Sequence, residues 1–131
     1  MTQAPARPDH GIVEKAITFF YYVDLPGAFD FYTQVMGFAL EIDQGWSKIL
    51  RIAEHAYVGL VDETRGMHRA NPIKPVQLCI RVPDVDAWHH YLAAQSAIGL
   101  TEPKDSVSLG IRAFVLEDPE GYQIEVQSVL R

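Results

Sequence analysis

The sequence predicts an α+β fold in which two tandem βαβββ modules form a curved mixed sheet around a cleft. Two observations lead to this prediction: a strand–Asp–helix pattern occurs twice, and each copy is followed by strand-like runs separated by turns. The length and composition, 131 residues with 48% hydrophobic and 21% charged side chains, agree with one globular domain. The chain is therefore expected to fold as a single unit with an internal repeat.

The repeat consists of residues 16–32 (AITFFYYVDLPGAFDFY) and residues 76–92 (VQLCIRVPDVDAWHHYL), which begin sixty positions apart. In each copy an apolar run is followed by an aspartate, Asp24 or Asp84, and then by a helical pattern. An aspartate at this place caps a helix, because its side chain accepts hydrogen bonds from the free N–H groups of the first turn. Both aspartates therefore predict the start of a helix.

The two predicted helices carry apolar residues at helical spacing. These are Leu25, Ala28, Phe29, Tyr32, Val35 and Met36 in the first helix, and Val85, Trp88, Tyr91 and Leu92 in the second. Gly37 is expected to end the first helix, because glycine readily adopts the left-handed conformation found after helices. Each helix should pack one face against a sheet.

Strand-like runs follow each helix. In the first half, residues 48–53 and 56–63 flank a turn at 54–55, and in the second half residues 110–118 and 121–130 flank the Asp-Pro-Glu-Gly sequence at 118–121. Asp-Pro-x-Gly favours a turn, because proline fixes φ and glycine tolerates positive φ. The resulting division is a flexible tail (1–13) and one domain (14–128) made of module one (14–64), a linker (65–75) and module two (76–128).

Charge and composition exclude several classes of partner. The formal net charge is −6 and the Lys and Arg residues are scattered, so no nucleic acid or anionic membrane partner is expected. No apolar stretch approaches the ~20 residues of a membrane span. The single cysteine, Cys79, cannot form an internal disulfide, so a cytoplasmic location is expected.

Several motifs together resemble the vicinal-oxygen-chelate superfamily of glyoxalase, bleomycin-resistance and dioxygenase-like proteins. They are the Asp24-to-Tyr32 stretch with Gly37-Phe38, the sequence Val-Pro-Asp-Val at 82–85, and the closing turn Asp-Pro-Glu-Gly-Tyr-Gln-Ile-Glu at 118–125. The resemblance covers about residues 14–128. It implies a glyoxalase-like fold and a ligand cleft between sheets, and it implies a homodimer, because this superfamily commonly pairs modules between chains.

The resemblance also places four metal-ligand positions in the cleft, and on this chain they are Ile17, Gly59, Gln77 and Glu125. Only Gln77 and Glu125 carry donor atoms, so they are weak metal candidates, and catalytic sites usually supply about three protein ligands. No cofactor is therefore expected, and a divalent metal is the disfavoured alternative. His89 is expected on a solvated helix face, and His68 on the linker surface, with closure over the cleft mouth as the alternative.

Strand alternation assigns the residues that should line the cleft and bind the ligand. They are Ile17, Phe19, Tyr21, Arg51, Tyr57, Gln77, Cys79, Arg81 and Val115; Ile49, Gly59, Val61, Ala113, Gln123, Glu125 and Gln127 also face inward. Two interpretations of Arg51 and Arg81 stay open. They bind a carboxylated or aromatic ligand through an oxyanion, or they neutralise Glu125.

Three functions follow from this lining. The first is a metal-independent enzyme of the lyase or isomerase type that uses Glu125 as its catalytic acid or base. The second is a non-catalytic binding or sequestering protein of the bleomycin-resistance kind, which needs only a shaped cleft. The third is a metal-dependent lyase or dioxygenase with an incomplete ligand set. All three predict a small-molecule partner.

Overall fold

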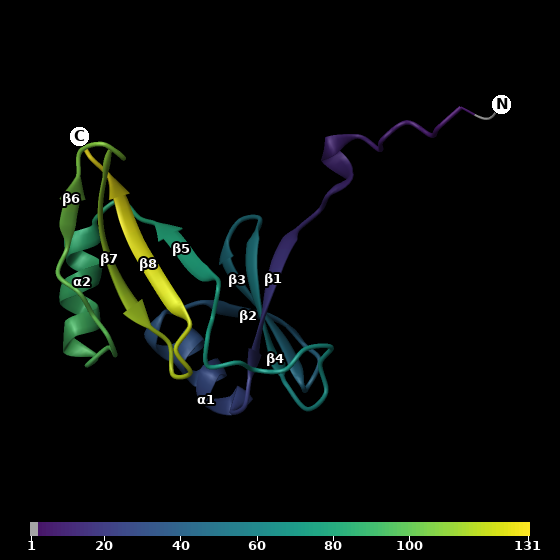
Figure 1. Ribbon diagram of the computed structural model, residues 1–131, viewed down its shortest axis with the longest axis horizontal. Helices are drawn as coiled ribbons and strands as arrows, with labels where there is room; N and C mark the ends of the chain where they lie inside the picture. Colours follow the sequence, from purple (N-terminus) through teal and green to yellow (C-terminus); the bar gives the residue numbers. More distant parts are fainter. Residues whose placement is uncertain (1–2) are drawn as a thin grey trace.

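The computed structural model describes residues 3–131 and contains two four-stranded mixed sheets, each with a helix packed on one face (Figure 1). Module one contains β1 (Ala16–Tyr22), α1 (Leu25–Asp30), β2 (Ala39–Asp43), β3 (Ser47–Ala53) and β4 (Ala56–Asp62). Module two contains β5 (Gln77–Arg81), α2 (Val85–Ala94), β6 (Lys104–Ser106), β7 (Ile111–Glu117) and β8 (Gln123–Val129). The predicted α+β fold of two tandem βαβββ modules is confirmed.

The two sheets have the same topology. The strand order is β1-β4-β3-β2 in module one and β5-β8-β7-β6 in module two. In each sheet the first and last strands of the module pair in parallel, and the other pairs are antiparallel. The first strand of each module therefore lies at a sheet edge, next to the strand that ends the module.

The predicted aspartate caps are confirmed in both helices. The side chain of Asp24 accepts a hydrogen bond from the N–H of Gly27, and that of Asp84 accepts one from Ala87, each at 3.1 Å. The first helix differs from the expected continuous α-helix, because a π-helical segment, η2 (Phe31–Val35), follows α1 directly. In this region the Thr33 hydroxyl donates to the Phe29 carbonyl at 2.7 Å, a contact that competes with regular helical bonding.

The hydrophobic core lies between each sheet and its helix, as strand alternation predicts. In module one, Phe20 and Tyr22 of β1 point toward the helix and are 2% and 0% exposed. Buried side chains at alternate positions of the other strands complete the core. They are Leu50, Val58 and Leu60 in module one, and Ile80, Phe114, Leu116, Ile124 and Val126 in module two. The opposite face of each sheet is therefore left for other contacts.

The two modules join at the turn between β7 and β8. The ring of Tyr122 stacks on that of Phe20, with ring centroids 4.3 Å apart. The buried carboxylate of Asp118 accepts hydrogen bonds from the hydroxyls of Tyr22 and Tyr32. All hydrogen bonds between the modules within residues 3–131 involve this turn or the contact of the Tyr91 hydroxyl with the Val35 carbonyl.

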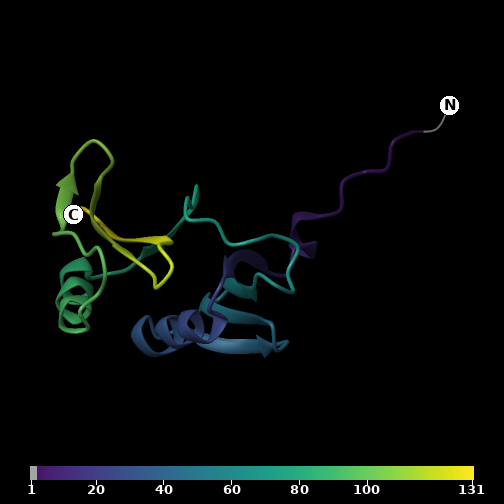
Figure 2. The same cartoon turned by 60° about the horizontal axis from the view of Figure 1, so that its bottom comes forward.

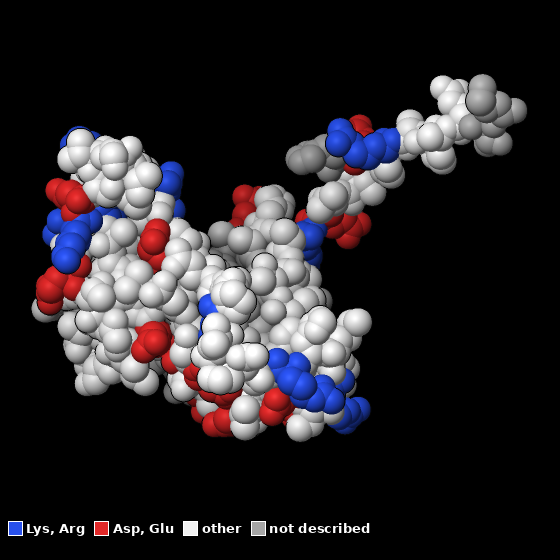
Figure 3. All heavy atoms as spheres, in the orientation of Figure 1, with Lys and Arg blue, Asp and Glu red and all other residues white. Residues whose placement is uncertain are grey.

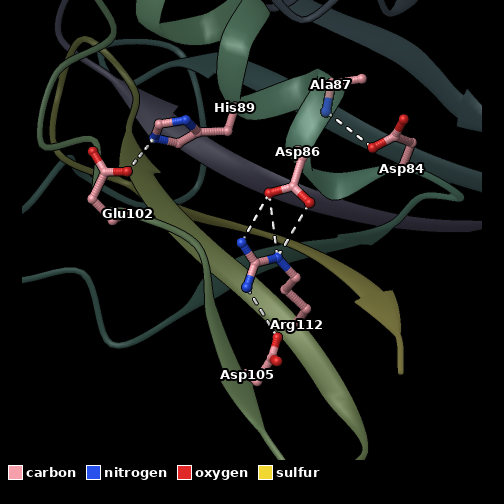
Figure 4. A network of polar contacts seen from close by, with 7 residues as sticks. All are labelled: Asp84, Asp86, Ala87, His89, Glu102, Asp105 and Arg112. Atoms are coloured by element: carbon pink, nitrogen blue, oxygen red, sulfur yellow. Dashed lines mark hydrogen bonds and ion pairs between the residues drawn. The ribbon is translucent and has the colours of Figure 1, made fainter. Parts of the chain in front are cut away.

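A charged network ties α2 to the outer strands of module two (Figure 4). Arg112 of β7 contacts Asp86 of α2 and Asp105 of β6, with N–O distances of 3.0 Å to each. His89, one turn further along α2, lies 3.9 Å from Glu102. The ion pairs of Arg112 lie at the molecular surface and hold the helix against its own sheet.

Two segments lie outside the sheets. The N-terminal segment, described from residue 3, contains a short 3-10 turn, η1 (His10–Ile12), and extends away from the body of the molecule (Figure 1). The linker crosses above module one before it reaches β5 (Figure 2). No helix within the described residues is long and apolar enough to cross a membrane.

Candidate functional site

The face of module one opposite its helix is mainly apolar and aromatic. Strand register places Ile17, Tyr57 and Arg51 in one row across β1, β4 and β3, and Phe19, Gly59 and Ile49 in the next. Tyr21, Val61 and Ser47 form the third row. The residues that alternation assigned to this inner face of module one therefore lie together on one side of the sheet.

The ring of Phe19 covers Gly59. A Cβ atom added at Gly59 would lie 2.3 Å from Cδ1 and 2.5 Å from Cε1 of Phe19, so the ring occupies the space that any larger side chain would need. Phe19 itself stays 41% exposed. The Phe19 ring thus lies over Gly59, in the middle of the inner face, and remains accessible.

The inner face of module two is polar. Cys79, Glu125 and Val115 stand in one row across β5, β8 and β7. The carboxylate of Glu125 accepts from the Gln127 amide at 2.6 Å, from the Cys79 thiol at 3.4 Å and from the Gln77 amide at 3.5 Å. Glu125 is therefore a half-buried acceptor at the centre of a set of side-chain donors.

The Cys79 thiol is a hydrogen-bond donor at neutral pH. Burial, and next the hydrogen bond and negative charge of Glu125, raise the pKa of Cys79 to about 11. The thiolate is the reactive form of cysteine, and it is scarce when the pKa lies this far above neutrality. The thiol therefore supports the Glu125 carboxylate, and its chemistry does not favour a nucleophilic role.

The two arginines of the predicted lining have different environments. The Nε and Nη2 atoms of Arg81 donate to Oε1 of Gln127 at 2.8 and 2.6 Å, and Gln127 in turn donates to Glu125. Arg51 is exposed, and its Nε donates to the carbonyl of Ala53 at 3.3 Å. Arg81 thus acts on Glu125 through Gln127, and neither of the two arginines forms an ion pair with Glu125 within the described residues.

The link through Gln127 is the functional contact that the sequence patterns miss. Alternation places Gln127 on the inner face, but the alternation pattern contains no information on which way an amide turns. Gln127 is only 8% exposed, and it bridges Arg81 and Glu125 by accepting from one and donating to the other. No local sequence pattern indicates this bridge, because it joins side chains of β5 and β8.

Two histidines make contacts that the sequence does not predict, and one of them departs from the expected surface placement. His89 packs edge-on against Phe114 at 5.2 Å, and its Nε2 is buried without a hydrogen-bond partner in the described part of the chain. The expectation of a solvated His89 was therefore wrong. His68 is exposed as expected, yet its ring also contacts Tyr21 edge-on at 5.2 Å, at the end of the inner face.

The residues at the four metal-ligand positions do not fit a metal site of the glyoxalase type. Ile17 has no donor atom, and at Gly59 the Phe19 ring fills the space of a side chain. On the other module, Gln77 directs its amide nitrogen toward Glu125. The described residues contain no group of three or more His, Cys, Asp or Glu that could hold a metal ion.

Two cavities lie beside the strands of the candidate site. One of about 590 Å³ lies between β1 and β5, mainly on the helix side, where its lining includes Thr18, Ile80 and Trp88. Its lining also includes Tyr57, Cys79 and Arg81 of the inner faces. A smaller cavity of about 310 Å³ lies between β1 and the linker, and its lining includes Phe19, Tyr21 and Tyr122. Both volumes fall near the range of small-molecule sites.

Comparisons with known proteins agree with this architecture. The chain is similar to a glyoxalase/bleomycin resistance/dioxygenase superfamily member from Sphaerobacter thermophilus, with a TM-score of 0.75 and 19% identity over 87% of this chain and 95% of that one. For a lactoylglutathione lyase from Agrobacterium tumefaciens the TM-score is 0.70 and the identity 21%, over 93% and 96% of the chains. For the fosfomycin resistance protein FosX from Listeria monocytogenes the TM-score is 0.68 and the identity 12%, over 86% of this chain and 90% of that one.

At these identities the likeness to solved structures shows the fold alone. No curated protein matches the sequence significantly. The sequence profile of the Glyoxalase/Bleomycin resistance protein/Dioxygenase superfamily matches residues 15–126, which is most of the chain. The chain therefore belongs to the Glyoxalase/Bleomycin resistance protein/Dioxygenase superfamily.

Proposed function

We propose that this protein binds a small organic molecule without a metal ion. The molecule would lie between the inner face of a module one and the inner face of a module two. The observation that carries the proposal is the contrast between these faces. The inner face of module one presents the Phe19 ring over Gly59, a position where a metal site would need a side chain with a donor atom. The inner face of module two presents the Glu125 carboxylate, which accepts from three side-chain donors. An apolar surface with a few fixed polar groups is typical of small-molecule sites.

The chemistry of each face limits the ligand. Phe19 and Tyr21 favour a planar, apolar body, because aromatic rings pack well against one another. Glu125 is an acceptor, so it favours a ligand that presents an N–H or O–H group toward β8. The charge-assisted hydrogen bond so formed would be stronger than one between neutral groups.

Binding can be tested with chelator-treated protein and a panel of planar aromatic compounds that carry an N–H or O–H donor. We expect saturable binding in calorimetry, recovery of the compound unaltered by mass spectrometry, and weakening by about tenfold or more in Glu125→Gln. Glu54→Gln, at an exposed turn, is the matched control and should bind as the wild type does. Binding that appears only after metal addition would reject the proposal.

A catalytic role for Glu125 is the second candidate, and its position supports it. The carboxylate lies on an accessible face beside a protonated thiol and an amide, where a proton could be passed to or from a bound molecule. Such a protein would be an acid–base enzyme of the lyase or isomerase type. Steady conversion of a bound compound, lost in Glu125→Gln while binding is retained, would favour this candidate over simple binding.

We further propose that the cleft is closed by a second copy of the chain. The modules of one chain meet at the β7–β8 turn and at Tyr91, so the contacts seen between modules do not bring the two inner faces together. A homodimer in which module one of one chain faces module two of its partner would enclose the ligand. Each site would then need both copies.

Subunit complementation tests this arrangement. A chain carrying Phe19→Ala and a chain carrying Glu125→Gln are each defective in one wall, and both should bind poorly alone. After denaturation and refolding together, about a quarter of the composite sites should be intact, because half of the dimers are mixed and each holds one intact site. No recovery in a mixture shown to contain mixed dimers would place both walls in one chain.

A further inference from the structure

The cavity between β1 and the linker has an aromatic floor. Phe19 and Tyr21 contribute from β1, and Tyr122 contributes from the turn that joins the modules. The linker is held close to this floor at Gly66, where an added Cβ would lie 2.6 Å from Val61 and 2.9 Å from the Tyr21 ring. The cavity, about 310 Å³ in volume, is thus formed by packing between the linker and the sheet.

Three basic side chains of the linker line the same cavity: His68, Arg69 and Lys74. The Nη1 atom of Arg69 donates to the carbonyls of Glu63 and Gly66, at 2.6 and 3.3 Å, which fixes the guanidinium at the linker. Lys74 places its ammonium group 4.7 Å above the centre of the Tyr122 ring. The positive groups of Arg69 and Lys74 are therefore positioned by contacts with carbonyls and a ring, and no carboxylate is among these contacts.

Two of the acidic residues near the linker accept hydrogen bonds from backbone N–H groups. Glu63 accepts from the N–H of Ala70, and Glu120 accepts from the N–H groups of Val23 and Asp24. The cavity lining contains no Asp or Glu, and none of the ion pairs within residues 3–131 includes Arg69 or Lys74. On a chain with a net charge of −6, Arg69 and Lys74 therefore place two positive charges in a lining without a carboxylate. On the face shown in Figure 3, several Lys and Arg side chains instead lie next to Asp or Glu.

We infer that this cavity is a subsite for an aromatic carboxylate, whose ring lies on Phe19 and Tyr21 and whose carboxylate contacts Arg69 and Lys74. The guanidinium fork and the ammonium group are the side chains that bind carboxylates most strongly. The inference rests on the proposed binding function, because Phe19 belongs to both surfaces. It places the carboxylate of the ligand at the linker, whereas strand alternation predicts Arg51 and Arg81 as its partners.

The inference can be tested with 2-naphthoate and its neutral analogue 2-naphthamide, titrated separately into the full-length protein and followed by two-dimensional NMR. We expect the wild type to bind the carboxylate about tenfold more tightly than the amide, with the largest shifts at residues 66–76. Arg69→Gln combined with Lys74→Gln should abolish this preference, so that the variant binds the carboxylate and the amide with similar affinity. Equal affinity of the wild type for both compounds, or no binding of either, would overturn the inference.

Two controls separate the subsite from the linker fold and from the proposed function. Arg65→Gln removes a positive charge from the same linker outside the cavity lining, where Arg65 lies over Trp46, and should keep the preference. Lys74→Gln alone leaves the Arg69 contacts intact and should reduce the preference about threefold. If Arg65→Gln weakens 2-naphthoate binding as much as the double variant does, the effect is general charge attraction and the subsite is rejected. A wild type that shows no preference for 2-naphthoate over 2-naphthamide, yet binds neutral donor compounds, would reject the subsite and leave the proposed function standing.

Discussion

The hydroxyl of Tyr22 in module one donates a hydrogen bond of 2.5 Å to Oδ2 of Asp118 in module two. Tyr32 donates to the same oxygen at 2.8 Å, and Oδ1 accepts from the N–H groups of Glu120 and Tyr122. Asp118 is only 1% exposed, so its charge is buried and held by four donors. The turn that ends the sequence motif is thus also the joint between the modules.

Removal of one of these hydroxyls should destabilise the whole chain. Tyr22→Phe leaves the buried carboxylate with one donor fewer, and we expect a loss of about 1–3 kcal/mol in the free energy of unfolding. Urea unfolding followed by circular dichroism measures this loss. Tyr91→Phe is the control, because it removes a more exposed intermodule hydroxyl and should cost about 1 kcal/mol or less. Equal effects of the two variants would contradict a special role for Asp118.

The same cluster predicts a loss of stability at alkaline pH. Burial, and next the charges within the Tyr–Asp118 cluster, raise the pKa values of Tyr22 and Tyr32 above the usual 10.0. The contribution of these two hydroxyls to the free energy of unfolding is therefore complete below pH 10 and decreases above it. The reason is that the unfolded chain releases these protons above pH 10 while the folded chain retains them. Each group should contribute a slope of about 1.4 kcal/mol per pH unit. Tyr32→Phe should reduce the measured slope above pH 10 by that amount, and an unchanged slope would contradict the assignment.

Gly59→Ala should disturb the inner face of module one. The added methyl group would lie 2.3 Å from Phe19, so the ring must move, and overpacking of this kind typically costs about 1–3 kcal/mol. Combining it with Phe19→Leu should recover part of the lost stability, because a smaller side chain can make room. Thermal unfolding of the single and double variants measures this coupling, and strictly additive effects would show that the ring does not cover the glycine.

Thiol reactivity reports on the Glu125 site without any ligand. Because burial and then Glu125 raise the pKa of Cys79 to about 11, the thiol should react slowly with iodoacetamide at pH 8. Glu125→Gln removes the negative charge and should increase the alkylation rate several-fold at that pH. An unchanged rate in the variant would show that the two side chains are not in contact. Glu54→Gln serves again as the control.

Local patterns were sufficient to predict most of the fold. The aspartate caps at Asp24 and Asp84, the helix end at Gly37 and the inward or outward direction of β1 and β5 follow from spacing over a few residues, and the structure agrees. The outer strands β2 and β6 did not emerge from the same patterns. All five residues of β2 are exposed and β6 has only three, so neither shows a buried alternation.

The site was less predictable, because its contacts join distant segments. The approach of Phe19 to Gly59 depends on the parallel register of β1 and β4, and the sequence of either strand alone does not contain it. The bridge from Arg81 through Gln127 depends on side-chain orientation across β5 and β8. The sequence predicts only a connecting role for the linker, yet Arg69 and Lys74 of the linker line a cavity. Such placements follow from tertiary packing, which periodicity does not encode.

The most direct test of the account is the affinity of chelator-treated protein for a planar aromatic compound with an N–H or O–H donor, measured in wild type and in Glu125→Gln. We expect that the wild type binds with the chelator still present and that Glu125→Gln binds about tenfold more weakly. Binding that requires added metal, or that Glu125→Gln leaves unchanged, would contradict a metal-independent cleft centred on Glu125.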